Sequence, residues 1–146
     1  KELNVKLFIL QFGGNVVPYI AENYTNYEKW YYSQIMRLKE LCPGVTVLVV
    51  GVADMSVKEK DRFVPYPNLE NVNKAIKNAA FKAKAAYWDL HKAMGGKNSM
   101  PAWVNANPPL ATTDYVHFTP RGSKLIAQML YNAFIYEYFR FEKIKR

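Results

Sequence analysis

The chain has 146 residues, of which 50% are apolar and 15% aromatic, a composition that excludes an intrinsically disordered chain and suits one folded domain. Its formal net charge of +8 favours anionic partners such as acidic glycans, but most lysines are scattered, so we expect solvated helix surface and no nucleic-acid site. No apolar run approaches the ~20 residues that cross a bilayer, and the single cysteine, Cys42, excludes an internal disulfide.

Strands and helices alternate in the predicted structure. Apolar runs without polar alternation are typical of buried parallel strands, and apolar residues at three- and four-residue steps predict helices. In chain order we expect a strand at Val5–Phe12, a helix from about Asn26 to Leu41, a strand at Val45–Val52, a long loop at Ala53–Pro67, a helix from Asn68 or Asn71 through Ala83, a strand at Ala86–Leu90, an irregular segment at His91–Thr113 and a helix from Pro120 to about Phe141.

This order predicts a single α/β domain over residues 1–146, with a parallel sheet and helices on both of its faces. Three strands make a thin sheet for such long helices, and Lys1 and Glu2 lead almost directly into a core strand. We therefore expect the fold to be incomplete at its amino terminus, with a segment missing ahead of Lys1.

The most informative motif lies just before the last helix. Asp114 precedes His117 by three residues, Thr119 can cap the helix, and Pro120 suits its first turn. A histidine so placed lies on a loop and faces solvent or substrate. An aspartate beside it can accept from one ring nitrogen and leave the other free to take a proton from a nucleophile. The pattern predicts the acid–base part of a hydrolytic triad.

A second motif follows the first predicted strand. Gly13-Gly14-Asn15 ends that strand with two glycines and a polar amide. Open α/β sheets bind their ligands beyond the carboxyl ends of parallel strands, which is where these residues are expected. The two glycines leave room for substrate to approach the backbone.

Together these motifs resemble the SGNH (GDSL-type) hydrolases, in which a Gly-x-Asn-Asp strand end is combined with a carboxy-terminal Asp-x-x-His. The stretch Tyr87-Trp88-Asp89-Leu90-His91, continued through Gly95-Gly96, Ser99 and Trp103, resembles the branch of peptidoglycan O-acetylesterases and related carbohydrate esterases. The resemblance implies a flavodoxin-like fold. It also implies that His117 is the general base and acid, that Asp114 orients it, and that Asn15 donates to the oxyanion. Gly13, Gly14 and Trp103 are the substrate-binding candidates, although Trp103, Met94 and Met100 could equally pack their loop onto the sheet.

The sequence departs from this family at two points. Val16 stands where the family has an aspartate, and no Gly-Asp-Ser motif occurs in the chain, so the serine nucleophile is expected upstream and the chain alone is expected to be inactive. Ser33 and Ser123 lie in helices and Ser56 in a charged loop. Ser99, which follows glycines in the irregular segment, is the internal alternative.

The resemblance implies an esterase that removes O-acetyl groups from a polysaccharide such as peptidoglycan, without a cofactor, in the periplasm or outside the cell. The expected partners are this substrate, or another small ester, and the missing amino-terminal segment. Asp89 and His91 could join Asp114 and His117 in a ligand set, but no spacing supports a metal site and we expect none. Two alternatives stay open: a glycan-binding module without chemistry, and a self-contained hydrolase that uses Ser99.

Overall fold

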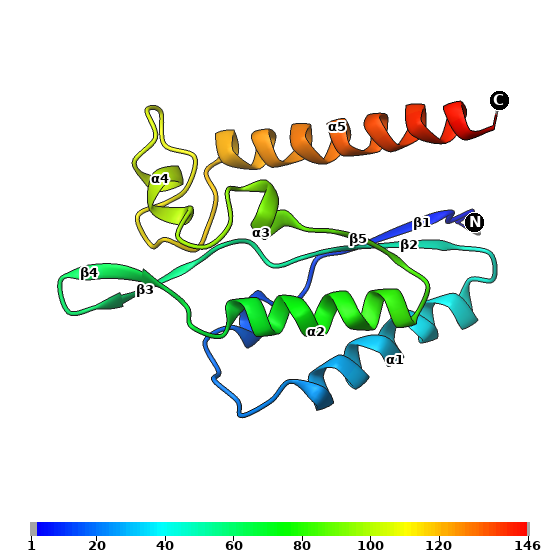
Figure 1. Cartoon of the computed structure of the whole chain (residues 1–146), viewed down its shortest axis with the longest axis horizontal. Coiled ribbons are helices and arrows are strands. Elements are labelled where there is room, and N and C mark those ends of the chain that lie inside the picture. Colours follow the sequence, from blue (N-terminus) through cyan, green and yellow to red (C-terminus); the bar gives the residue numbers. More distant parts are fainter. Residues whose placement is uncertain (1–2, 146) are drawn as a thin grey trace.

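The structure, a computed structural model, describes residues 3–145. Its longest helices lie on either side of a small sheet (Figure 1). In chain order the elements are β1 (Leu7–Leu10), the 3-10 turn η1 (Gly14–Val16), α1 (Thr25–Leu41), β2 (Thr46–Val50), β3 (Ser56–Glu59), β4 (Arg62–Pro65), α2 (Leu69–Lys82), β5 (Ala86–Trp88), α3 (Leu90–Ala93), α4 (Met100–Val104) and α5 (Pro120–Ile144).

The main sheet is parallel, as the apolar runs predicted. Its strand order is β1-β2-β5, with Leu7 opposite Thr46 and Leu48 opposite Ala86. The central strand β2 is buried on both faces beyond Thr46, which explains why its sequence shows no alternation. In the described part of the chain β1 is an edge strand, and the side chains of Leu7 and Ile9 are 41% and 51% exposed.

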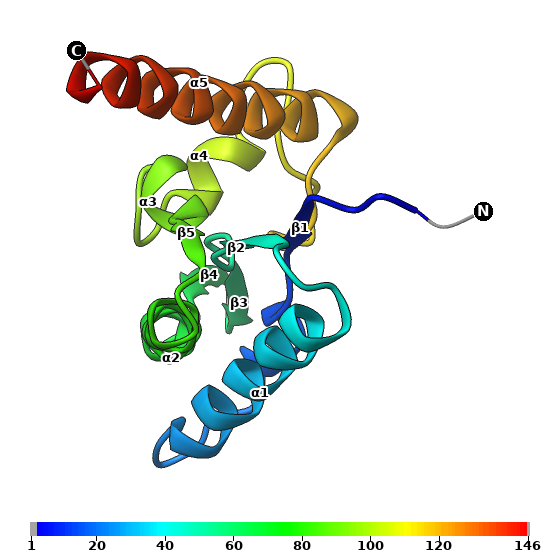
Figure 2. The same cartoon turned by 90° about the vertical axis from the view of Figure 1, so that its right-hand side faces the viewer.

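Helices cover both faces of this sheet, which confirms the predicted architecture. Figure 2 shows α1 and α2 on one side and α3, α4 and α5 on the other. The α1–α2 side holds the larger core, in which Ile35, Val49 and Ile76 are almost fully buried. The other side holds a smaller core around Leu90, Met100 and Trp103.

Helix α5 is anchored mainly through its first half. Ile126 and Met129 pack against the smaller core, whereas Tyr131, Phe134 and Tyr138 are exposed. Within residues 3–145, no helix combines the length and the hydropathy that a membrane span requires.

The predicted loop at Ala53–Pro67 was wrong in its middle part. Strands β3 and β4 form an antiparallel hairpin there, with Ser56 opposite Pro65 and Glu59 opposite Arg62. Tight hairpin turns usually carry Asn-Gly or Asp-Gly, because they need residues at positive φ. Here Lys60 takes that conformation, with a φ of 53°, so the sequence lacks the usual signal.

The irregular segment predicted at His91–Thr113 contains two short helices. In α3 the Asp89 carboxylate accepts a hydrogen bond from the Lys92 N–H at 2.9 Å, and α4 has Pro101 in its first turn. Helices of four and five residues are too short for apolar periodicity to reveal them.

Candidate active site

Asp114 and His117 form a close pair on the loop before α5. The distance between Asp114 Oδ2 and His117 Nδ1 is 2.7 Å, and the two side chains are 49% and 77% exposed. With the proton on Nδ1, His117 donates to the carboxylate and its Nε2 is free to accept a proton. This is the geometry that the Asp-x-x-His spacing predicted.

Hydrogen bonds within the loop hold the carboxylate in place. The second oxygen, Asp114 Oδ1, accepts from the Thr112 hydroxyl at 2.6 Å, from the Val116 N–H at 2.9 Å and from the His117 N–H at 3.0 Å. The Thr112 N–H also donates to the His117 carbonyl at 2.8 Å. An aspartate that binds the backbone two and three residues ahead forms a tight turn, and here the turn brings residue 117 back over residue 114.

The same contacts set the charge of Asp114. Burial opposes ionisation, but hydrogen bonds from the His117 backbone, the Thr112 hydroxyl, the His117 ring and the Val116 backbone outweigh it and lower the pKa of the Asp114 carboxyl well below its usual range. Asp114 is therefore a carboxylate at neutral pH. It can stabilise the imidazolium that forms when His117 takes a proton.

The start of α5 fixes the position of this loop. The Thr119 hydroxyl accepts from the Gly122 N–H at 3.1 Å, which confirms the predicted cap, and Pro120 occupies the first turn. Any side chain at Gly122 would collide with the Leu110 carbonyl, which itself accepts from the Thr119 N–H at 3.0 Å. The glycine therefore allows the helix to start against the preceding loop.

The glycines after β1 have different environments. Gly13 has a φ of 122°, which L side chains rarely adopt, and a Cβ there would lie 2.7 Å from Ile76 Cδ1 and 2.9 Å from Val52 Cγ2, so the fold itself favours glycine at this position. A Cβ at Gly14 would meet nothing within 4 Å. Asn15 follows in η1 and is exposed, while the neighbouring Val16 packs against the larger core.

One open cleft of about 850 Å³ brings four of the six predicted site residues together. Gly13, Gly14, Asn15 and His117 all line it. Such a volume is in the usual range of small-molecule sites. The remaining lining residues are Gln11, Phe12, Val16, Pro18, Tyr27, Trp30, Val52, Ala53, Met55, Tyr66, Val116 and Phe118.

The cleft offers a base and an amide but no nucleophile. Among the described residues that line it there is no serine, threonine or cysteine. Burial raises the pKa of Tyr27 to about 12, which makes a nucleophilic phenolate at this residue even scarcer near neutral pH than at an ordinary tyrosine. Ser99 lies at the start of α4, its hydroxyl is buried without a hydrogen-bond partner, and it does not line the cleft.

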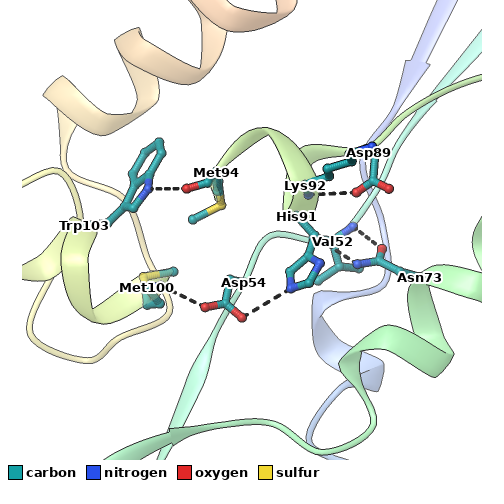
Figure 3. A network of polar contacts seen from close by, with 9 residues as sticks. All are labelled: Val52, Asp54, Asn73, Asp89, His91, Lys92, Met94, Met100 and Trp103. Atoms are coloured by element: carbon teal, nitrogen blue, oxygen red, sulfur yellow. Dashed lines mark hydrogen bonds and ion pairs between the residues drawn. The ribbon is translucent and has the colours of Figure 1, made fainter. Parts of the chain in front are cut away.

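A buried polar network supports the segment that follows β2, and Figure 3 shows it. The Asn73 amide makes two hydrogen bonds to the backbone of Val52, 2.7 Å to its N–H and 2.9 Å to its carbonyl. Asp54 Oδ2 accepts from the Met100 N–H at 2.8 Å, and Asp54 Oδ1 faces His91 Nε2 at 3.5 Å. Because Val52, Ala53 and Met55 line the cleft, the network holds one of its walls.

This network also gives roles to the polar residues of the Trp88–His91 region. Asp89 caps α3, and His91 faces Asp54 instead of Asp114 or His117. In the part of the chain that the structure describes, no group of three or more His, Cys, Asp or Glu side chains is placed to hold a metal ion.

Trp103 does not lie where a substrate-binding residue is expected. It is 7% exposed, its indole N–H donates to the Met94 carbonyl at 3.0 Å, and it does not line the cleft. Its ring packs against Phe118, which does line the cleft, at a centroid distance of 5.4 Å. Trp103 therefore packs against a residue of the cleft without lining the cleft itself. Met94 and Met100 are also buried in the smaller core.

Sequence reasoning missed Asn73, Asp54 and Tyr66. Tyr66 follows the unpredicted hairpin, and Asn73 lies on a helix face that otherwise reads as core. A polar residue within that buried stripe is the signal that could have identified Asn73.

No protein-family model matches the chain, and no curated protein sequence matches it. The solved structures that are similar to it include the following three. A peptidoglycan O-acetylesterase superposes with a TM-score of 0.80 at 25% identity, and the match covers 92% of this chain and 38% of that one. An acetyl xylan esterase superposes with a TM-score of 0.65 at 20% identity, and the match covers 89% of this chain and 67% of that one. A gut microbial diltiazem-metabolizing enzyme superposes with a TM-score of 0.55 at 18% identity, and the match covers 87% of this chain and 32% of that one.

The last two matches show the fold alone. All three share the fold that the resemblance implied, and the similarity to the peptidoglycan O-acetylesterase is consistent with an SGNH hydrolase-like domain. The chain spans 38% of the length of the peptidoglycan O-acetylesterase.

Proposed function

We propose that this chain supplies the acid–base pair and an oxyanion donor of a serine ester hydrolase that removes O-acetyl groups from a polysaccharide such as peptidoglycan. The observation that carries the proposal is the 2.7 Å pair of Asp114 and His117, in which His117 lines the same open cleft as Asn15. The similarity to a peptidoglycan O-acetylesterase and an acetyl xylan esterase supports an ester-cleaving activity and this class of substrate. A polysaccharide substrate of this kind implies action in the periplasm or outside the cell.

The chemistry would run in two steps. A serine hydroxyl attacks the acyl carbon while His117 Nε2 takes its proton, and the carbonyl electrons move to the oxygen, which the Asn15 amide stabilises. The intermediate collapses, the sugar oxygen leaves with the proton from His117, and an acyl-enzyme remains. Water then attacks the acyl carbon while His117 takes its proton. The second intermediate collapses, His117 returns the proton to the serine oxygen, and acetate is released. Gly14, beside Asn15, leaves the backbone accessible to the acyl group.

We place the nucleophile outside residues 1–146, on a segment that pairs with the open edge of β1. Three observations support this placement: the cleft lining contains no serine, β1 has an unpaired edge in the described residues, and its side chains Leu7 and Ile9 are exposed. Exposed apolar edge strands invite pairing. A preparation of residues 1–146 that is monomeric, soluble and fully active would contradict this placement.

The decisive experiment labels the natural gene product that carries this chain with a fluorophosphonate probe and locates the label by mass spectrometry. Acetate release is measured in parallel from O-acetylated peptidoglycan, from acetylated xylan and from a chromogenic acetyl ester. We expect the label on a serine outside residues 1–146, and loss of both labelling and acetate release in His117→Ala.

Each of the other outcomes contradicts the proposal in a distinct way. A label on Ser99 identifies the self-contained hydrolase instead. No label and no acetate release, with glycan affinity unchanged in His117→Ala, identifies a binding module without chemistry.

A further inference from the structure

We infer that the hairpin β3–β4 positions the Asp114–His117 pair, acting through the contact of Phe63 with Tyr115. Only the catalytic consequence of this inference rests on the proposed function, because the geometry concerns the loop itself. The hairpin extends from the end of the molecule at which the loop before α5 also lies (Figure 1). It was absent from the sequence-based expectations, and no residue of its two strands lines the cleft.

Tyr115 is the residue on which the turn depends. Its φ is 60°, a conformation that is uncommon for residues other than glycine, asparagine and aspartate. It lies between Asp114 and Val116, so it sets the direction in which the chain returns. The Val116 and His117 N–H groups reach Asp114 Oδ1 only because the backbone turns back at this residue. A change of conformation at Tyr115 would move the imidazole away from Asp114.

Both strands of the hairpin contact Tyr115. The Tyr115 and Phe63 rings stack with centroids 3.6 Å apart and planes 10° from parallel. The Tyr115 carbonyl accepts from the Ser56 N–H at 3.0 Å. Phe63 belongs to β4 and Ser56 to β3, so the turn is held through a side chain by one strand and through the backbone by the other.

The base of the hairpin is continuous with the cleft. The Tyr66 N–H donates to the Met55 carbonyl at 3.3 Å, just outside the paired strands, and both residues line the cleft. The opposite end is exposed and charged, from Lys58 to Arg62. The hairpin therefore contacts the cleft wall at its base, through Met55 and Tyr66, and the histidine loop further along, through the Phe63–Tyr115 stack.

The tautomer of His117 reports this positioning directly. The chain has two histidines, so the ring ¹⁵N signals of His117 can be assigned by comparison with a His91→Gln variant. A hydrogen bond from Nδ1–H to Asp114 selects one tautomer of the neutral ring. We expect that tautomer in the wild-type chain at alkaline pH, and Asp114→Asn provides the reference for a ring without the carboxylate.

Phe63→Leu keeps an apolar side chain but removes the stack. The His117 shifts in this variant are expected to move more than half of the way toward those of Asp114→Asn. Phe63→Tyr, which keeps an aromatic ring, and Phe81→Leu, a control that removes a 58% exposed ring from α2, are expected to match the wild type. The His91 signals and the melting temperature serve as checks on folding.

Wild-type His117 shifts in a folded Phe63→Leu overturn the inference. Should Phe63→Leu fail to fold, Tyr115→Leu tests the same stack from the other side, and wild-type shifts there overturn it equally. In the active hydrolase we expect kcat to fall about 10- to 100-fold in Phe63→Leu with KM little changed, and Phe63→Tyr to restore it. Altered shifts without any acetate release from the wild type would refute the proposed function and leave the positioning role intact.

Discussion

Single side chains carry the proposed chemistry, and their contacts assign them different roles. Asp114 is held by four hydrogen bonds from its own loop, whereas Asn15 is exposed and has no hydrogen bond from its side chain in the described residues. The carboxylate is therefore fixed before substrate arrives. The amide is free to donate to a substrate oxygen.

Asn15→Ala tests the oxyanion role. We expect kcat for acetate release to fall by about 10²- to 10³-fold, because such a donor acts mainly in the transition state. Gln11→Ala is the matched control, since Gln11 is another exposed polar residue of the same cleft. Equal losses in the two variants would rule out a specific oxyanion role for Asn15.

Asp114 also links stability to pH. Its pKa is lowered in the folded state, so its contribution is fully present above the unfolded value of about 3.9 and is lost as pH falls through the lower folded value. Urea unfolding at several pH values should show that Asp114→Asn is less stable than wild type from neutral pH down to about 4, with the difference shrinking below that. Asp61→Asn at the exposed hairpin tip controls for loss of one carboxylate. A difference that persists unchanged at pH 2 to 3 would contradict this linkage.

At the scale of elements, the long periodic segments were predictable and the short ones were not. The three strands of the parallel sheet and the helices α1, α2 and α5 follow from apolar patterns that extend over several turns or residues. The hairpin was not predicted because Lys60 replaces the usual turn residues. Helices α3 and α4 were not predicted because a helix of about one turn is too short to show a periodic apolar pattern.

The residues of the candidate site also fall into those that the sequence could predict and those that it could not. His117, Asp114 and Asn15 were predictable because each belongs to a local motif at the end of an element. Asp54, Asn73 and Phe63 act through contacts with distant segments, which no local pattern encodes. Trp103 illustrates the reverse error, since an aromatic residue that follows a glycine-rich stretch can pack inward as readily as it can face substrate, and here it is buried in α4.

Asn73 fixes the end of β2 from helix α2. Asn73→Ala leaves the Val52 N–H and carbonyl buried without partners, and each such group costs about 1–3 kcal/mol. We expect the free energy of unfolding to fall by about 2–4 kcal/mol in chemical denaturation. Asn78→Ala, on the exposed side of the same helix, should change it by less than about 0.5 kcal/mol. Similar changes in the free energy of unfolding in the two variants would contradict the role of Asn73 in fixing the end of β2.

Gly122 sets how closely α5 approaches the preceding loop. Gly→Ala within a helix normally stabilises by about 0.5–1 kcal/mol, but here the new Cβ would collide with the Leu110 carbonyl. Because that atom is backbone, we expect Gly122→Ala to lower stability by about 1–3 kcal/mol, measured by thermal unfolding. Ser123→Ala, one residue later on the exposed side, is the control. A Gly122→Ala variant that is more stable than the wild type would contradict this prediction and would show that the loop at Leu110 can move away from the helix.

At the scale of the whole molecule, a buried pair of His91 and Asp54 joins α3 to the segment that follows β2. His91 lies on α3 and Asp54 on the segment after β2, with side chains 13% and 1% exposed. The Asp54 carboxylate raises the pKa of His91, burial lowers it, and the carboxylates of Asp54, Asp89 and Glu70 raise it further through their charge, so the net direction is upward. The fold therefore holds His91 more strongly in its protonated form.

This pair makes global stability depend on pH near neutrality. A raised folded pKa contributes stability that is fully present below the unfolded value of about 6.5 and is lost as pH rises through the folded value. The stability difference between wild type and His91→Gln should be largest in mildly acidic solution and should decrease toward alkaline pH. Lys92→Gln removes a neighbouring exposed charge and should show no such trend. A difference that grows with pH would contradict the assignment.

Within residues 3–145 one edge of β1 is unpaired, and this restricts which strand could extend the sheet. A strand that continues the parallel order cannot be joined to β1 by a tight turn, because successive parallel strands need a crossover of about a dozen residues or more, usually helical. A serine delivered by such a strand would therefore arrive with a helix attached to the same polypeptide. The uncovered Leu7 and Ile9 are apolar surface on which that added helix could rest.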